Sequence, residues 1–299
     1  MMKKIYVKKI INEIYVQDSF MVIKKLYRDG NRTIAYIGDK TGNIKSSIID
    51  ESNLLIDGDV IWVKGKKKLL FEVNEFKKLH KYDINEYLPT INKPMEEIIE
   101  EINVISKNEF HSEETMNLND YFFKNNDFMK KFIAGIGGLT QHHNYRGGLA
   151  EHTLNVMYLA KILTYRYDCA HKDIAILAAK LHDIGKVEEY FVEGPFSVTL
   201  RGEMEGHIVI GISMLEEAFR VGGNIYSDDF KQRVRGCIVQ HHGKVEYGSP
   251  KPPNTEEAFI VHYADYLDAN FNKIGQVKDG TKLGAWSEYD RRIGVRLYV

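Results

Sequence analysis

Between residues 10 and 80, short hydrophobic segments alternate with polar turn residues. The segments TIAYIGD, NIKSSIID, DVIWVKG and LLFEVNEF are rich in β-branched and aromatic residues, which favour strands. Turn signals separate them at Asp29-Gly30-Asn31, Thr41-Gly42-Asn43 and Asp57-Gly58-Asp59. Five short strands within about 70 residues predict a small closed barrel, for which the OB-fold is the common five-stranded case.

The pattern changes over residues 81–94, where large apolar residues are few and Pro89 and Pro94 occur. This composition is typical of a linker. Pro94 then suits the first position of a helix through MEEIIEEINVISKNEF, because that position needs no backbone N–H donor.

Further along the chain, the hydrophobic positions follow a helical period. In the first such segment, Leu149, His152, Val156, Leu159 and Leu163 share one face. Five segments show this pattern: GLAEHTLNVMYLAKILTYRY, KDIAILAAKLHD, EGHIVIGISMLEEAF, DDFKQRVRGCIVQHH and EEAFIVHYADYLDANF. The stretch from about Gly275 is rich in glycine and charge, and it predicts no element.

Together these patterns predict an α+β multidomain protein. We expect a five-stranded OB-like barrel over residues 1–80, a linker and connecting helix over 81–115, and an all-α helical bundle over 116–299. The length of 299 residues suits two domains.

Composition places the chain in a reducing compartment. Its two cysteines, Cys169 and Cys237, lie in helical segments without partners at metal-ligand spacing, which argues against a disulfide framework. The N-terminal sequence MMKKIYVKKI lacks the apolar core of a signal peptide. No apolar run approaches the roughly 20 residues of a membrane helix. We therefore expect a cytoplasmic protein with no membrane partner.

Charge is distributed unevenly. Residues 1–80 contain 16 Lys and Arg against 10 Asp and Glu, a net of +6, whereas the remainder contains 25 against 32, a net of −7. A basic barrel favours contact with nucleic acid, and Tyr36, Trp62 and Phe71 could stack on bases. The alternatives are chance clustering, because Lys66–Lys68 supply half of the excess, and aromatic rings that simply fill the barrel.

Seven residues on or at the ends of the expected helices indicate a metal site. Taken singly, each has a structural explanation: a lone histidine on an apolar face is more often a hydrogen-bonded core residue. Asp183 is harder to explain, because a carboxylate is unfavourable near a helix C-terminus. Their ordered occurrence across five helices favours metal binding. The residues are His152, His182, Asp183, His207, His241, His242 and Asp265.

Imidazole and carboxylate groups are good ligands for first-row divalent metals. Asp183 is the best bridging candidate, because its two oxygens can bind different ions. We expect one ion on His152, His182, Asp183 and Asp265, and the other on Asp183, His207, His241 and His242. Two such ions, about 3.5–4 Å apart, can hold a bridging hydroxide that attacks a phosphodiester. The imidazoles favour Mn, Fe, Co or Zn over Mg.

The order His152, His182-Asp183, Asp265 resembles the HD phosphohydrolase superfamily, and His207 with His241-His242 resembles its two-metal branch. More closely, the chain resembles the YhaM-type 3′→5′ exoribonucleases, which join an OB-fold to an HD domain. The matching stretches are GDKTGNIKSSIID, HHNYRGGLAEHTL, LHDIGKVEEY, GHIVIG, QHHGKVEYGSPKPP and HYADYLDA. This resemblance implies an HD-type domain over 116–299, single-stranded RNA, or also single-stranded DNA, trimmed from its 3′ end, and Mn as the ion.

Further site candidates adjoin these motifs. Lys186 is expected to be catalytic with Asp183, because it could reach the scissile phosphate; a surface lysine after a glycine turn is the alternative. Lys244 could hold a second phosphate. His142, His143 and Arg146 lie in a glycine-rich loop that could contact substrate or only cover the bundle.

Other functions remain open at this stage. An HD enzyme acting on a nucleotide or cyclic dinucleotide is one, although such an enzyme does not need a basic barrel. A non-catalytic OB-fold protein that binds nucleic acid is another, although the intact ligand set argues against it. A homo-oligomer also remains open.

Overall fold

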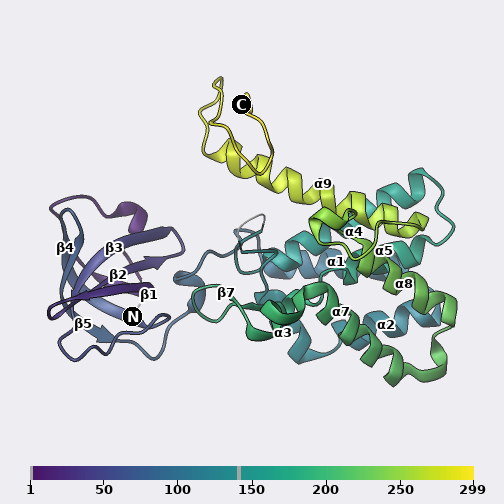
Figure 1. Ribbon diagram of the computed structural model, residues 1–299, viewed down its shortest axis with the longest axis horizontal. Helices are drawn as coiled ribbons and strands as arrows, with labels where there is room; N and C mark the ends of the chain where they lie inside the picture. The colour runs from purple at the N-terminus through teal and green to yellow at the C-terminus, as the bar shows by residue number, and fades with distance from the viewer. Residues whose placement is uncertain (1–2, 140–142) are drawn as a thin grey trace. The chain divides into compact units, whose positions relative to one another are not determined.

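Two compact units make up the chain in a computed structural model, which describes residues 3–139 and 143–299 (Figure 1). One unit comprises Met1–Thr90 together with Phe191–Ser197, and the other comprises Ile91–Tyr190 and Val198–Val299. The β-strands of the barrel lie in the first unit, and the long helices lie in the second.

Five strands of the first unit form a closed barrel in the order β1-β2-β3-β5-β4. Every neighbouring pair is antiparallel except β3 and β5, which are parallel. Closure gives each of these strands two neighbours in the sheet. The predicted five-stranded barrel is therefore confirmed. Its strands are β1 (Tyr15–Asp29), β2 (Arg32–Asp39), β3 (Gly42–Ile49), β4 (Val60–Lys67) and β5 (Phe71–Lys78).

Apolar side chains fill the barrel. Phe20 and Phe71 are fully buried with their rings edge to face, and Ile37 and Ile48 are buried with them. Phe71 therefore belongs to the core, and the suggestion that it stacks on bases is wrong.

The second unit is a helical bundle, as predicted. Several of its helices begin with side-chain caps, at Ser112, Asn125, Thr199, Ser227 and Thr255, each of which accepts a hydrogen bond from a backbone N–H of the first turn. The helices are α1 (Met95–Glu109), α2 (Glu113–Phe123), α3 (Asn126–Ala134), α4 (Gly148–Arg166), α5 (Lys172–Leu181), α6 (Lys186–Glu189), α7 (Leu200–Gly222), α8 (Asp228–Gln240) and α9 (Glu256–Asp279). Between α6 and α7, a small hairpin pairs β6 (Tyr190–Phe191) with β7 (Ser197–Val198).

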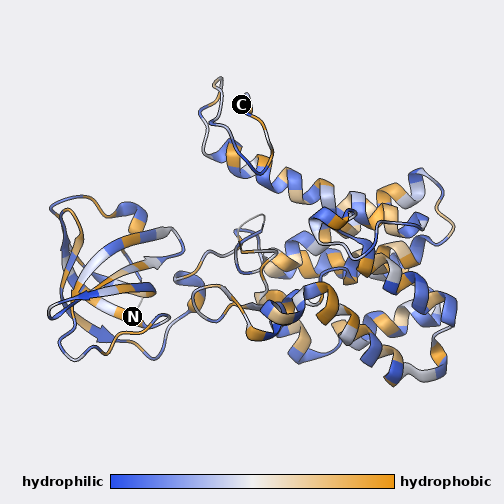
Figure 2. Cartoon of the chain, viewed as in Figure 1, coloured by the Kyte–Doolittle hydropathy of each residue, from blue (hydrophilic) through white to orange (hydrophobic). Residues whose placement is uncertain are grey.

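Helix α5 lies at the centre of this bundle. All of its residues from Ile174 to Leu181 are buried, and a helix that is buried on every side must be surrounded by other elements. Its neighbours α4, α8 and α9 bury one face each, so hydrophobic and hydrophilic residues alternate along them (Figure 2). Helix α1, expected as a connection, contributes Ile98, Ile102 and Ile105 to the same core.

The remaining elements are short. Among the described residues, 3-10 helices occur at η1 (Val7–Lys9), η2 (Ile84–Glu86), η3 (Gly223–Ile225) and η4 (Val245–Tyr247). After α9, isolated bridges pair Trp286 with Tyr298 and Asp290 with Val295, so the C-terminal stretch folds back on itself. Within residues 3–139 and 143–299, no helix combines the length and apolar character that crossing a membrane requires.

Candidate metal centre

The structure brings the seven predicted ligands together from distant parts of the chain. His152 lies on α4, His207 on α7 and Asp265 on α9, while the pairs His182-Asp183 and His241-His242 directly follow α5 and α8. Because α5 packs against α4, α8 and α9, the end of α5 meets side chains from all three helices. His152, His182, Asp183 and His241 are buried.

One group of ligand atoms lies around Oδ2 of Asp183. This oxygen is 3.2 Å from Nε2 of His182 and 3.4 Å from Nε2 of His152. Nε2 of His152 is in turn 3.1 Å from Nε2 of His182 and 3.2 Å from Oδ1 of Asp265. Two imidazole nitrogens and two carboxylate oxygens therefore converge, which suits one transition-metal ion.

A second group lies around the other oxygen of the same carboxylate. Oδ1 of Asp183 is 3.5 Å from Nε2 of His207 and 3.6 Å from Nε2 of His241. A ligand atom of His242 completes a cluster with these two histidines in which all three atoms lie within 4.8 Å of one another. The two oxygens of Asp183 thus point to different groups of ligands, which is the arrangement that a bridging carboxylate requires.

Four of these atoms are buried without a hydrogen-bond partner among the described residues: Oδ1 of Asp183, Nε2 of His207, Nε2 of His241 and Nδ1 of His242. Buried polar atoms are nearly always paired, because an unpaired one costs desolvation free energy without compensation. All four belong to the second group, so one bound cation there would satisfy them at once. Together with the converging atoms of the first group, the residues present fit a two-metal site.

Hydrogen bonds at the opposite ring nitrogens orient the histidines. Nδ1 of His182 donates to the carbonyl of Ala179 (2.8 Å), and Nδ1 of His241 donates to that of Ile238 (2.7 Å). A carbonyl only accepts, so these rings carry the proton on Nδ1 and present a lone pair at Nε2 when neutral. Nδ1 of His207 lies 3.2 Å from Oε1 of Glu189, which orients that ring in the same way.

Electrostatics also favour cations here. Burial by itself would raise the pKa of Asp183, but Lys186 and His182 outweigh it and hold that pKa well below the usual range. Burial lowers the pKa of His241 well below its usual value, and the neighbouring His242 lowers it further, so the His241 ring is neutral. Ionised carboxylates and neutral imidazoles are the protonation states that bind metal.

Two glycines allow α6 and α7 to meet at the site. Gly206 has φ +71° and ψ 158° and interrupts α7, so that His207 begins a second helical segment. A left-handed φ of this kind favours glycine. A Cβ on Gly185 would lie 2.0 Å from the carbonyl oxygen of His207, so only glycine permits this approach. Asp183 can therefore lie close to His207.

Sequence reasoning missed three residues that support the ligands. Oδ2 of Asp268 is 2.6 Å from Nδ1 of His152, and Oδ1 of Asp268 accepts a hydrogen bond of 2.7 Å from Asn155. Glu189, the third, supports His207. A signal for Asp268 was present: it follows Asp265 by three positions, a spacing that places both residues on the same side of a helix.

Lys186, predicted to be catalytic, is buried. Its Nζ lies 2.6 Å from both Oδ2 of Asp183 and the carbonyl oxygen of Gly137. The ammonium group is thus engaged with the candidate bridging carboxylate.

The loop residues have different environments. His143 is buried, with Nε2 2.8 Å from Oδ2 of Asp268, while Arg146 is half-buried just before α4. Lys244 is exposed beside the ring of Tyr247. The prediction for His142 lies outside the described residues.

The two aromatic candidates of the barrel differ in exposure. Tyr36 is 39% exposed on β2, with Lys24 of β1 and Lys45 of β3 as its direct cross-strand partners. Direct partners share a face of the sheet. Trp62 is half-buried on β4, opposite Ser19 and Lys77.

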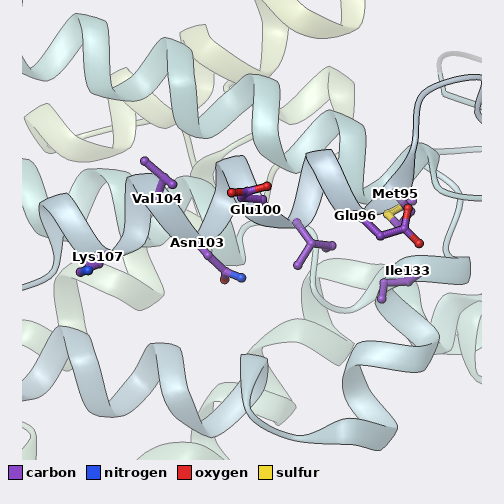
Figure 3. Close-up of a pocket in the computed structure, with 8 residues that line it drawn as sticks. Met95, Glu96, Glu100, Asn103, Val104, Lys107 and Ile133 are labelled. Atoms are coloured by element: carbon purple, nitrogen blue, oxygen red, sulfur yellow. The ribbon is translucent and has the colours of Figure 1, made fainter.

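A cavity of about 370 Å³ opens beside the ligands Asp183, His242 and Asp265. Its other lining residues are Lys186, Tyr247, His262, Tyr266, Ala269 and Lys273. A larger cavity of about 630 Å³ lies along α1, with Ile133 at the end where Met95 lies (Figure 3), and none of the seven predicted ligands lines it. Of these two cavities, the smaller one therefore adjoins the predicted metal ligands.

Comparisons with known proteins agree with this geometry. The model of the HD domain family matches residues 149–270, which include all seven predicted ligands, so the fold and site define a metal-dependent phosphohydrolase of the HD type. The chain is 30% identical over 266 residues to the 3'-5' exoribonuclease YhaM of Geobacillus sp. (strain WCH70), covering 84% of this chain and 79% of that protein. It therefore belongs to the YhaM family, and the resemblance noted in the sequence is confirmed. No solved structure matches the chain.

Proposed function

We propose that the chain is a 3′→5′ exoribonuclease that hydrolyses single-stranded RNA with two divalent metal ions. One observation carries the two-metal part: the two oxygens of Asp183 point to two separate groups of ligand atoms, and four of these buried atoms have no partner among the described residues. The RNA substrate and the direction come from the name of the Geobacillus relative.

Each ligand has a role in this proposal. His152, His182, Asp183 and Asp265 would hold one ion, and Asp183, His207, His241 and His242 would hold the other. Two bound ions would activate a water molecule and neutralise charge on the transferring phosphoryl group. Mn is our first choice, with Fe, Co or Zn as alternatives, because imidazoles dominate the ligand set.

Around the ligands, the chain itself supplies orientation. Lys186 lies against Asp183 and would fix the carboxylate so that each oxygen stays directed at its own group. Asp268 would do the same for His152, with His143 behind it. These contacts support positioning roles for Lys186 and His143.

The barrel would capture the RNA strand. Tyr36 lies between Lys24 and Lys45, which combines a surface for base stacking with charges for phosphates. Arg146 and Lys244 remain proposed phosphate contacts near the catalytic site, and Trp62 remains a proposed contact on the barrel. A cytoplasmic location is also proposed, because both cysteines are free and buried.

Incubation with labelled substrate tests this function. Purified protein with Mn should shorten 5′-labelled single-stranded RNA progressively from the 3′ end, with single-stranded DNA tested in parallel. Asp183→Ala should abolish hydrolysis, because it removes a ligand from both ions, whereas Asp279→Ala at the exposed end of α9 should not. Elemental analysis should find two ions per chain. Internal cleavage, or hydrolysis of free nucleotides alone, would refute the proposal.

A further inference from the structure

The cavity beside the metal ligands has an aromatic wall that metal binding does not require. Tyr247 and Tyr266 line it, and these residues are 57% and 51% exposed. Tyr266 directly follows the predicted ligand Asp265, and Tyr247 lies in η4, shortly after His241-His242. Exposed rings in a cavity of this kind offer flat apolar surfaces to a planar ligand.

His262 links this wall to the metal ligands. Its Nδ1 donates a hydrogen bond of 2.8 Å to the carbonyl oxygen of His241. Its ring centroid lies 6.2 Å from that of Tyr266, one helical turn along α9. This hydrogen bond therefore ties α9, which carries Tyr266, to the segment that carries the predicted ligands His241 and His242.

Lys273 supplies a positive charge to the same cavity. It lies two turns beyond Asp265 on α9 and is half-buried, and within the described parts of the chain it makes no hydrogen bond or close ion pair. Burial lowers its pKa, although Asp265 partly offsets this effect. Lys186, the other lysine of the cavity, is already engaged by Asp183 and Gly137. Lys273 is thus the ammonium group that is available to an incoming anion.

We propose that this cavity is the subsite for the 3′-terminal nucleotide, with its base stacked on Tyr266 beside Tyr247 and its phosphate close to Lys273. The inference rests on the proposed nuclease function and specifies where that function recognises its substrate. The volume of about 370 Å³ falls within the range of roughly 300–1,000 Å³ typical of small-ligand sites. Every base has a π-face, so stacking holds the terminal nucleotide without selecting a sequence.

Two RNA substrates that differ only at the 3′ end test the stacking. One ends in an ordinary nucleotide, and the other ends in an abasic ribose. The wild-type protein should have a kcat/KM about tenfold higher for the first, since stacking on one aromatic side chain has about this effect. Tyr266→Ala should bring the ratio close to one, and Tyr266→Phe should preserve it. Tyr158→Ala is the matched control, because Tyr158 is similarly exposed (57%, against 51% for Tyr266) but lies on α4 outside the cavity.

The ratio of kcat/KM for the two RNAs distinguishes a nucleotide-binding role of Tyr266 from a structural role. If Tyr266→Ala slows both substrates equally, the ring supports the fold and the subsite is refuted. If the variant changes the mass of the protein in solution and leaves the ratio intact, the rings form an interface between two copies, which also refutes it. A wild-type protein that digests both RNAs equally well refutes the subsite alone. A wild-type protein that shortens neither RNA refutes the proposed function.

A second pair of variants tests the phosphate contact. Lys273→Met should lower kcat/KM about tenfold on both RNAs without changing their ratio, because the phosphate is common to both. Lys273→Arg should retain most of the activity. Unchanged kcat/KM in Lys273→Met would refute the role of Lys273. Equal metal content in all variants would show that the metal site is intact.

Discussion

Asp268 affects the candidate site without belonging to the ligand set. Its Oδ2 lies 2.6 Å from Nδ1 of His152 and 2.8 Å from Nε2 of His143. Burial by itself would raise its pKa, but hydrogen bonds from His143 and His152 hold that pKa below the usual range. An ionised Asp268 therefore fixes the His152 ring with Nε2 directed at the other ligands.

Removing this support should weaken metal binding. Asp268→Ala should lower the affinity for Mn about 10- to 100-fold, the usual effect of losing a carboxylate behind a ligating histidine. Isothermal titration calorimetry on the metal-free protein would measure it, with Asp279→Ala on the same helix as control. An unchanged affinity would show that the α4 backbone alone orients His152.

Lys180 is a buried charge away from the metal ligands. Its Nζ donates to Oγ of Ser106 and Oδ1 of Asn119 and lies 3.7 Å from the ring centroid of Phe123. Burial lowers its pKa to about 7. Because an unfolded lysine has a pKa of about 10.4, the unfolded chain binds more protons between these values, and stability should rise with pH across that window.

Replacing Lys180 should remove this pH dependence. Lys180→Met should raise the Tm by a few degrees near pH 7, where charging the buried lysine costs most, and by less near pH 10. Thermal unfolding at both pH values measures the difference, with the exposed Lys107→Met on α1 as control. A variant that is destabilised equally at both values would show that the hydrogen bonds of Lys180 outweigh its desolvation.

At the scale of elements, the break in α7 decides where His207 lies. Gly206 adopts a left-handed φ within the helix, and Glu189 accepts hydrogen bonds from the backbone N–H and Nδ1 of His207 just after the break. A continuous α7 would direct the His207 ring elsewhere, because each residue turns the helix by about 100°. The second group of ligands depends on this irregularity.

A pair of glycine substitutions isolates the conformational effect. Gly206→Ala should destabilise the protein by about 1–2 kcal/mol, because a left-handed residue with a Cβ is strained, and it should reduce the bound metal below two ions per chain. Gly275→Ala on α9 is the matched control: neither site has atoms near the added Cβ, but only Gly206 has a positive φ. Equal effects of the two substitutions would contradict this explanation.

At the scale of the whole molecule, the N-terminal 80 residues, which contain the barrel strands, and the rest of the chain carry opposite charge. Residues 1–80 have a net charge of +6, and the remaining residues have −7. Several barrel lysines are neutralised locally: Lys66 pairs with Glu13, Lys68 with Glu72 and Lys78 with Asp59. Lys24 and Lys45 flank Tyr36 instead, so this strip is the part of the barrel best suited to a nucleic-acid strand.

The strip formed by Lys24, Tyr36 and Lys45 should control the binding of long RNA substrates. Replacing Lys24 and Lys45 by Gln should weaken binding of long single-stranded RNA and make it less salt-dependent. The log–log slope should fall by about 0.7 for each phosphate that the protein no longer neutralises. Cleavage of a dinucleotide should change little, because the catalytic site is unaltered. Replacing the exposed Lys8 and Lys9 by Gln is the control with equal charge change. A salt slope that falls equally in both double variants would mean that net charge, and no particular strip, captures the strand.

The sequence by itself determined the elements and the set of metal-ligand candidates. Strand and helix periods are local, so the barrel strands and the helices around His152 and Asp265 followed from neighbouring residues. The ligand types and their order along the chain were equally visible, because imidazole and carboxylate chemistry does not depend on the fold.

Only the tertiary structure decided which partner each polar side chain contacts and therefore which role it can have. Asp268 meets His152 across 116 positions and His143 across 125, and no local pattern contains such a contact. The burial of Lys180, the engagement of Lys186 by Asp183, and the availability of Lys273 likewise depend on which helices pack together. Periodicity tells which face of a helix is buried, whereas long-range packing selects the partner that each buried polar group meets.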